Sequence, residues 1–289
     1  MKIAILGKNP KSSPSNLLIF NSMKKIMPAT LYADIQKVNL SVDGGSRVMY
    51  KGKDLAEFDL IYPRINPSLA DFGYITVRML EESVYSPISS DSIRVSHDKF
   101  LTLQVLAKAG LPVPKTILTI GREKMEKVFE QIGFPMVLKL LSASGGKGIL
   151  LASDLKEAKG IADTLHWFKQ LVFIEEYVPN PGEDIRLFVV GDEVVASMKR
   201  VAGKGDFRSN IHAGGRGERY VPTEEEKEIA LRASEAIGAE IAGIDILKGP
   251  EGPVIIETNI FPGVRGIMGA TKKDIPKLIA EFLHRKVKT

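Results

Sequence analysis

Gly243-Ile244-Asp245-Ile246-Leu247 and Val254-Ile255-Ile256-Glu257-Thr258-Asn259 are two apolar strand candidates that carry acids and flank the turn 249–252. Alternate residues of a strand face one side, so Glu257 and Asn259 project together and Asp245 is expected to join them. Carboxylate and amide oxygens, without histidine or cysteine, suit a hard cation such as Mg²⁺. The apolar neighbours favour this metal site over the alternative, a solvated acidic face.

A second pattern lies about a hundred residues earlier, where a glycine-rich turn follows an apolar strand. The turn reads Ser142-Ala143-Ser144-Gly145-Gly146-Lys147-Gly148, and small residues of this kind let backbone N–H groups surround phosphates. The string is neither a Walker A loop nor a dinucleotide fingerprint, and a plain hairpin is the alternative. Lys139 lies inside the apolar strand just before the turn, where its ammonium needs an anionic partner.

The chain divides into three units that differ in their pattern of predicted strands and helices, at residues 1–95, 96–178 and 179–289. The first unit alternates strands and helices, which favours a parallel sheet. Its predicted strands are 2–6, 29–33 and 58–64, and its helices are 16–27 and 71–83. The second unit is predicted to contain helices 99–109, 122–132 and 154–168 and strands 115–120, 136–141, 148–152 and 171–178.

The third unit is predicted to be antiparallel. Gly191-Asp192 separates strands 184–190 and 193–201, which is a hairpin signal. Thr223 and Glu226 form a capping box for a helix that ends near residue 237, and a last helix covers about 273–285. Strands 242–247 and 254–257 complete the unit.

The composition of the 289 residues is that of an ordinary globular protein, with 44% hydrophobic and 26% charged residues. The absence of cysteine excludes disulfides and thiolate metal sites. No apolar run is long enough for a membrane span, and the amino terminus has no signal-peptide pattern, so we expect a cytoplasmic protein. The net charge of +5 indicates either a solvated basic surface or attraction for polyanions, such as ATP, a polyglutamyl substrate or RNA.

These motifs together resemble the ATP-grasp superfamily, and within it the RimK-type α-L-glutamate ligases. The resemblance covers nearly the whole chain and is densest over 96–275. It is carried by Asp184-Ile185-Arg186, Gly205-Asp206-Phe207-Arg208-Ser209-Asn210, the strand 243–247 and Glu257-Thr258-Asn259…Pro262-Gly263. The glycine turn is a loose match, and the loop 260–266 has no assignable role, which leaves the acceptor open.

The resemblance implies an α/β (α+β) ATP-grasp fold, in which an N-terminal α/β pre-ATP-grasp domain precedes two α+β subdomains that enclose the nucleotide. It assigns ATP contacts to Lys99, Lys139, Glu176, Tyr177, Val178, Asp184, Arg208, Ser209 and Asn210. It assigns two Mg²⁺ (or Mn²⁺) ions to Asp245, Glu257 and Asn259. Arg200 is placed near the transferring phosphoryl group.

The activity implied by the resemblance is ATP-dependent joining of an amino acid, expected to be L-glutamate, to an acceptor carboxylate through an acyl phosphate. The expected acceptor is a protein C-terminus, a carrier protein or a glutamate-tailed coenzyme. A LysX-like ligase acting on a carrier-linked amino acid is the alternative enzyme. A non-catalytic nucleotide-binding or RNA-associated module is the alternative from another class, and homo-oligomerisation stays open.

Overall fold

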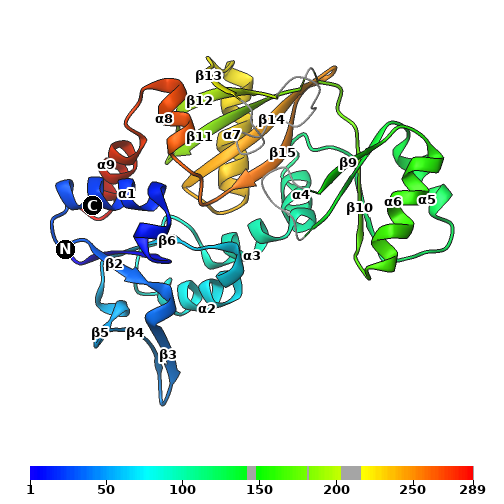
Figure 1. Ribbon diagram of the computed structural model, residues 1–289. Coiled ribbons are helices and arrows are strands. Elements are labelled where there is room, and N and C mark those ends of the chain that lie inside the picture. The colour runs from blue at the N-terminus through cyan, green and yellow to red at the C-terminus, as the bar shows by residue number, and fades with distance from the viewer. Residues whose placement is uncertain (142–147, 181, 203–215, 289) are drawn as a thin grey trace.

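The computed structural model describes residues 1–141, 148–180, 182–202 and 216–288, and it contains three lobes (Figure 1). The N-terminal lobe is built on a parallel sheet of β1 (Ile3–Gly7), β2 (Leu31–Asp34) and β6 (Leu60–Arg64), in the order β2-β1-β6. Helices α1 (Pro14–Ile26) and α2 (Ala70–Leu80) separate the strands in the sequence. The predicted alternation and the parallel sheet are therefore confirmed.

The N-terminal lobe also contains elements that the sequence analysis did not predict. Strands β3 (Val38–Val42), β4 (Ser46–Tyr50) and β5 (Lys53–Asp54) form a small antiparallel sheet. Strand β3 reads VNLSV, an alternation of apolar and polar residues that the sequence analysis missed, whereas β4 reads SRVMY and does not alternate. Helix α3 (Ser90–His97) was also missed. Four single-turn 3₁₀ helices link these elements: η1 (Pro10–Ser12), η2 (Ile35–Lys37), η3 (Leu55–Glu57) and η4 (Pro67–Leu69).

The central lobe follows helix α4 (Lys99–Lys108) and consists of an antiparallel sheet with two helices on one face (Figure 1). The sheet order is β7-β10-β8-β9. Its elements are β7 (Thr116–Thr119), α5 (Met125–Ile132), β8 (Met136–Lys139), β9 (Ile149–Ala152), α6 (Leu155–Trp167) and β10 (Val172–Glu176). Each of them lies within or close to a range predicted from the sequence.

The C-terminal lobe is a larger antiparallel sheet in the order β13-β12-β11-β14-β15. Its elements are β11 (Glu183–Val190), β12 (Glu193–Val201), β13 (Arg216–Arg219), α7 (Glu224–Ala236), β14 (Ile241–Gly249), β15 (Gly252–Asn259), α8 (Arg265–Thr271) and α9 (Ile275–Lys286). The hairpin between β11 and β12 turns at Gly191, whose φ of 67° favours glycine. The capping box of Thr223 and Glu226 is present at the start of α7.

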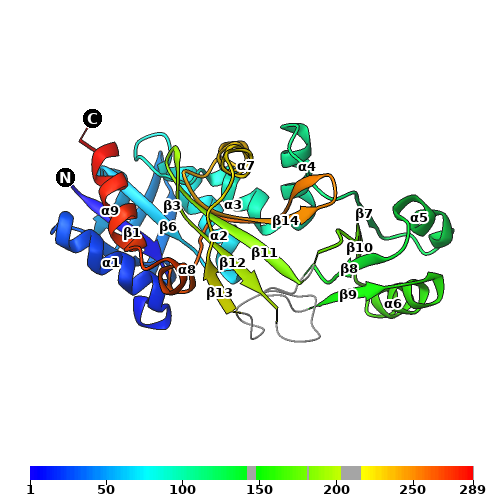
Figure 2. The same ribbon diagram turned by 90° about the horizontal axis from the view of Figure 1, so that it is seen from above.

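In the described part of the chain, the buried apolar side chains form two clusters rather than three. One cluster joins the N-terminal sheet to the C-terminal sheet, and α9 packs against α1 near the chain start (Figure 2). The other cluster belongs to the central lobe alone and includes Phe129, Met136 and Ile174. The N- and C-terminal lobes therefore share a core, whereas the central lobe has its own. The three-unit division at residues 95 and 178 stays a prediction.

Within the described ranges, no helix combines the length and the apolar character that crossing a membrane requires.

Candidate active site

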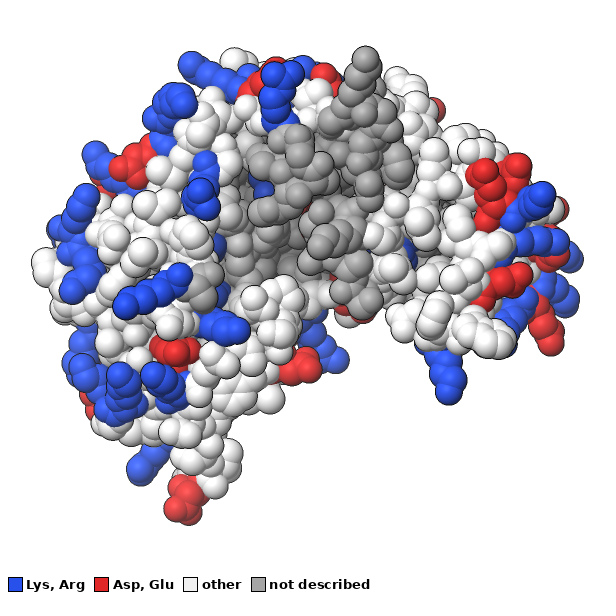
Figure 3. Space-filling view, viewed as in Figure 1, with Lys and Arg blue, Asp and Glu red and all other residues white. Residues whose placement is uncertain are grey.

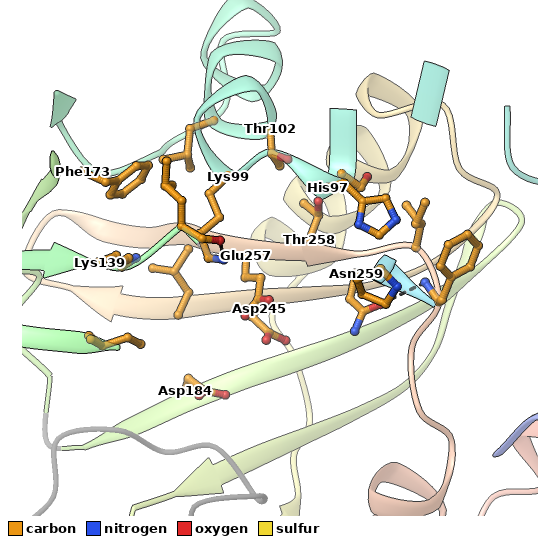
Figure 4. A pocket seen from close by; sticks show the side chains of 18 of the residues that line it. His97, Lys99, Thr102, Lys139, Phe173, Asp184, Asp245, Glu257, Thr258 and Asn259 are labelled. Atoms are coloured by element: carbon orange, nitrogen blue, oxygen red, sulfur yellow. Dashed lines mark hydrogen bonds between the residues drawn. The ribbon is translucent and has the colours of Figure 1, made fainter. Parts of the chain in front are cut away.

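A cleft of about 580 Å³ lies where the three lobes meet, and residues from all of them line it. Its volume is in the range of small-molecule sites. Figure 3 shows the molecule hollowed between its lobes, and Figure 4 shows the interior. Lys139 and Phe173 lie at one end, Glu257 and Asp245 in the middle, and Asn259 and His97 toward the other end.

Strands β14 and β15 bring the three predicted metal ligands together. Asp245 is the direct partner of Glu257, and Gly243 is the partner of Asn259. The three side chains therefore share one face of the hairpin, as the strand period requires. Among the described residues no cluster of three or more histidine, cysteine, aspartate or glutamate side chains is found, so the candidate set is two carboxylates and one amide.

Asp245 is fully buried and is held by two arginines. Arg186 donates from Nε to Oδ1 at 2.7 Å and from Nη2 to Oδ2 at 2.6 Å, and Arg200 donates from Nη2 to Oδ2 at 2.6 Å. Burial acts to raise the pKa of Asp245, but Arg186 and Arg200 more than offset this and lower it. A carboxylate has about four lone-pair sites, so Oδ1 retains one site for a cation.

Glu257 makes no hydrogen bond or close ion pair within the described part of the chain, and its side chain is exposed to the cleft. It lies between Lys99 and Asp245 (Figure 4). Although solvent reaches the carboxyl, surrounding protein raises its pKa by desolvation, and the charge of Asp245 adds to the rise. A bound cation relieves both effects. The amide oxygen of Asn259 accepts from the backbone N–H of Phe261 at 2.9 Å, which fixes its orientation. These residues fit a Mg²⁺ site.

Lys139 has the anionic partner that its apolar strand requires, namely Glu175. Lys139 is opposite Phe173 on the neighbouring strand, and Glu175 lies two residues further along the same face. The ammonium donates to Oε1 of Glu175, a carboxyl whose pKa burial raises and Lys139 lowers. The other oxygen, Oε2, is buried without a hydrogen bond in the described structure. Sequence reasoning missed Glu175, although the period-two spacing along β10 indicates its face.

Lys99 lies at the start of α4 beside the same ion pair. Its Nζ donates to the carbonyl of Leu141 at 3.4 Å. Burial lowers the pKa of Lys99, Glu257 acts against this, and Lys139 adds to the lowering. Two cations therefore face one wall of the cleft, where anionic phosphates would stabilise their charged forms.

The predicted hinge and ribose-binding residues also line the cleft. Glu176 accepts from the backbone N–H of Lys115 at 2.8 Å, and Val178 packs against the end of β14 at Gly249. Asp184 accepts from Nε of Arg200, so it is buried against the predicted catalytic arginine. Burial tends to lower the pKa of Arg200, but Asp245 and Asp184 raise it beyond its usual value.

Several predicted features lie outside the described residues: Arg208, Ser209, Asn210 and the glycine turn 142–147. The structure brings together the remaining predicted residues, Lys99, Lys139, Glu176, Tyr177, Val178, Asp184, Arg200, Asp245, Glu257 and Asn259. Their roles stay predictions. Two groups beside them were not predicted as site residues: Arg186, which holds Asp245, and His97, which lines the cleft with a buried Nε2.

Solved structures define the class of this fold. The ATP-grasp ligase PsnB aligns with a TM-score of 0.78 at 20% identity, covering 99% of both chains. A RimK domain ATP-grasp protein from Sphaerobacter thermophilus aligns with a TM-score of 0.71 at 20% identity, covering 98% of this chain and 99% of the other. The predicted ATP-grasp fold is thereby confirmed.

Residues 96–283 match the RimK-like ATP-grasp domain, and residues 1–93 match the RimK PreATP-grasp domain. The chain belongs to the RimK-like ATP-grasp family.

Curated relatives agree over the full length. A probable alpha-L-glutamate ligase of Coxiella burnetii is 38% identical and covers all of this chain and 97% of its own length. One from Nitrosococcus oceani is 35% identical, covering 99% of this chain and 96% of its own. One from Rhodopirellula baltica is 36% identical over 99% of this chain and 72% of its own length. The chain is therefore an ATP-dependent carboxylate–amine ligase, and ATP and Mg²⁺ are typical of its family.

Proposed function

We propose that this enzyme joins L-glutamate to an acceptor carboxylate, in a reaction that uses ATP and two Mg²⁺ ions and passes through an acyl phosphate. The observation that carries the proposal is Glu257, a carboxylate in the cleft that no described residue pairs with, directly across the strands from Asp245 and beside Lys99. The names of the full-length relatives support glutamate as the added amino acid.

The reaction has two balanced steps. An oxygen of the acceptor carboxylate attacks the γ-phosphorus of ATP, the bond to the bridging oxygen breaks, and ADP leaves. The amine of glutamate then attacks the acyl carbon, phosphate leaves and the amine loses a proton. No enzyme side chain forms a covalent bond to a substrate in these steps. Catalysis therefore depends on positioning the reactants and on neutralising the negative charge of the phosphate oxygens.

The chain's own residues supply these two effects. Lys99 and Lys139 place two ammonium groups at the end of the cleft where phosphates are proposed to bind. Asp245, Glu257 and Asn259 would hold the metal ions, which neutralise charge on the phosphate oxygens when bound. Arg200 is proposed to act at the transferring phosphoryl group, and its ion pairs with Asp184 and Asp245 hold it in one orientation.

The products test this mechanism. With ATP, Mg²⁺, L-glutamate and an acceptor such as tri-L-glutamate, the enzyme is expected to release ADP and phosphate in equal amounts. When hydroxylamine replaces glutamate, a hydroxamate is expected on the acceptor carboxylate, because hydroxylamine attacks the acyl phosphate. Stoichiometric AMP and pyrophosphate, measured by chromatography, would overturn the acyl-phosphate route. Candidate acceptors are a protein C-terminus, a carrier protein and a glutamate-tailed coenzyme, and ADP release ranks them.

Replacement of Lys139 tests the phosphate end of the cleft. Lys139→Met is expected to weaken ATP binding by about tenfold or more, because a charge-assisted contact is lost, and to change adenosine binding little. Calorimetric titration of both ligands measures the difference. The matched control is the double variant Lys139→Met with Glu175→Gln, which removes both charges and leaves no buried carboxylate unpaired. Equal losses for ATP and adenosine in the double variant would show that Lys139 is structural.

A further inference from the structure

Arg64, the last residue of β6, is a buried cation whose charge has no acidic partner among the described residues. Its side chain lines the cleft, yet the residue is only 5% exposed. Nε donates to Oδ1 of Asn16 and Nη2 donates to the carbonyl of Pro262, both at 2.9 Å, so both acceptors are neutral. A buried charge is costly unless an opposite charge or several hydrogen bonds compensate it.

The hydrogen bonds of Arg64 are also incomplete. A guanidinium has five N–H donors, and the bonds to Asn16 and Pro262 use two of them. The buried Nη1 has no hydrogen bond in the described structure. Burial raises the pKa of Tyr62, and its contact with Arg64 acts against this rise, so the two groups are close. Neither the Tyr62 hydroxyl nor Nη1 of Arg64 has a hydrogen-bond partner of normal length in the described structure.

A polar network keeps Arg64 in this position. The amide of Asn16 accepts from Arg64 and donates from Nδ2 to the Tyr32 hydroxyl at 3.3 Å, which donates to the carbonyl of Lys8 at 2.8 Å. The network ties the ends of β1 and β6 to the first turn of α1. Gly7 permits this approach, since a Cβ there would lie 2.8 Å from the carbonyl oxygen of Arg64.

The bond from Arg64 to Pro262 places this group beside the metal-site loop. Pro262 lies three residues after Asn259, and Val264 in the same loop donates its N–H to Oγ of Ser15 at 3.2 Å. Asn259 lies toward the end of the cleft opposite Lys139 (Figure 4). Arg64 therefore continues the cleft beyond Asn259, away from the lysines proposed for the phosphates. The loop 260–266, whose role the sequence left open, docks on this wall.

The cleft wall contributed by the N-terminal lobe carries positive charge only. It includes Lys8 and Arg64, whereas every described acid in the cleft lining lies between residues 175 and 257. Ser13, the N-cap of α1, also lines the cleft, and the first turn of this helix contains no acid, so its dipole adds to the positive potential. Lys and Arg side chains are also frequent on the lobe that contains α1 and α9 (Figure 3).

We propose that Lys8 and Arg64 form an anion subsite that binds a non-reacting carboxylate of one of the two substrates. The inference rests on the proposed function, because it adds a second carboxylate contact to the ligation. A carboxylate fits better than a nucleotide phosphate, since the phosphates are proposed to bind at the Lys99 and Lys139 end, and one carboxylate can interact with the ammonium of Lys8 and the remaining positive charge of Arg64. The subsite makes the enzyme select dianionic substrates over their amides.

The test measures carboxylate binding without turnover. Protein saturated with Mg²⁺ and ADP is titrated with tri-L-glutamate and with L-glutamate in a calorimeter. L-Glutamine, which keeps the α-carboxylate but lacks the side-chain carboxylate, serves as the comparison. The variants are Arg64→Gln, Arg64→Lys and Lys8→Met. Lys11→Met is the matched control, because Lys11 is an exposed neighbour of Lys8 that does not line the cleft.

The proposal expects a selective loss. Arg64→Gln is expected to weaken binding of a carboxylate probe by about tenfold or more, and Lys8→Met, whose side chain is exposed, by about threefold. The affinity of every variant for ADP should equal that of the unaltered protein. Lys11→Met should also bind the carboxylate probes with unaltered affinity, and Arg64→Lys should bind them more tightly than Arg64→Gln. Lys8→Met cannot act by disturbing a buried network, so an unchanged affinity of Lys8→Met for both probes overturns the subsite, whatever Arg64→Gln does.

Two further assays identify the source of the carboxylate. In the hydroxylamine reaction only the acceptor is needed, so a raised KM for tri-L-glutamate in Arg64→Gln assigns the subsite to the acceptor. A raised KM for glutamate alone in the complete reaction assigns it to the amino acid. If the enzyme forms ADP and the variants at Lys8 and Arg64 keep the affinity and KM of the unaltered protein, the subsite is wrong and the proposed function is unaffected. If probe binding depends on Lys8 and Arg64 but the enzyme forms no ADP with any acceptor, the subsite is supported and the proposed function is wrong.

Discussion

Replacing Glu257 by glutamine is expected to lower kcat by at least about a hundredfold while the protein stays folded. The carboxylate faces the cleft, has no described hydrogen bond and has a raised pKa that a bound cation would lower, so its removal affects metal binding rather than packing. Asn259→Ala should have an effect in the same direction. Turnover is measured at saturating Mg²⁺ and ATP, with the melting temperature recorded for each variant.

The raised pKa of Glu257 predicts the direction in which Glu257→Gln changes the melting temperature. Desolvation by the surrounding protein and the charge of Asp245 raise the pKa of Glu257, so the charged form is disfavoured in the folded protein. A neutral glutamine should therefore not lower the melting temperature without metal. The metal-dependent stabilisation should shrink, since fewer ligands hold the ions. A near-normal rate for Glu257→Gln at saturating Mg²⁺ would remove this residue from the metal site.

Asp245→Asn is expected to destabilise the fold strongly, in contrast to its partner across the strands. Asp245 is 1% exposed and accepts three hydrogen bonds from Arg186 and Arg200. Without its charge, two guanidinium groups at the same place lose their shared counter-ion, which costs about 3–5 kcal/mol. The melting temperature should fall by at least about 5 °C.

Glu257→Gln is the matched control for this loss. Glu257 and Asp245 are direct partners across the two strands, but of these two carboxylates only Asp245 accepts from Arg186 and Arg200 among the hydrogen bonds described. The two arginines keep the pKa of Asp245 below its usual value despite burial, so its stabilisation is present at neutral pH and disappears as the pH falls below about 4. Equal melting temperatures for Asp245→Asn and Glu257→Gln would contradict this account of the ion pairs.

The sequence predicted well those features that depend on local periodicity. The two-residue period placed Glu257 and Asn259 on one face, and the hairpin pattern then brought Asp245 beside them. The capping box of α7 and the glycine turn at Gly191 were also visible, because each motif is defined by a few neighbouring residues.

Contacts between distant segments were not predictable from the same reasoning. Arg186 reaches Asp245 across 59 residues, and Arg64 reaches Pro262 across 198, so neither partner is implied by spacing along the chain. Strand β5 has only two residues and cannot show an alternation, whereas the alternation in β3 was present in the sequence and was missed. The shared core of the terminal lobes likewise depends on α9 returning to α1, which a linear pattern of units does not reveal.

The separate apolar cluster of the central lobe has a consequence for how the protein opens. Among the described residues, Phe129 and Ile174 belong to a cluster confined to that lobe, and the chain enters and leaves it near Pro114 and Tyr177. Such a lobe is expected to unfold locally as one cooperative unit, with a lower free energy of opening than the rest of the molecule. Amides of β8 and β10 should therefore exchange with deuterium together and earlier than those of β1 and β14, and bound ATP should slow that exchange.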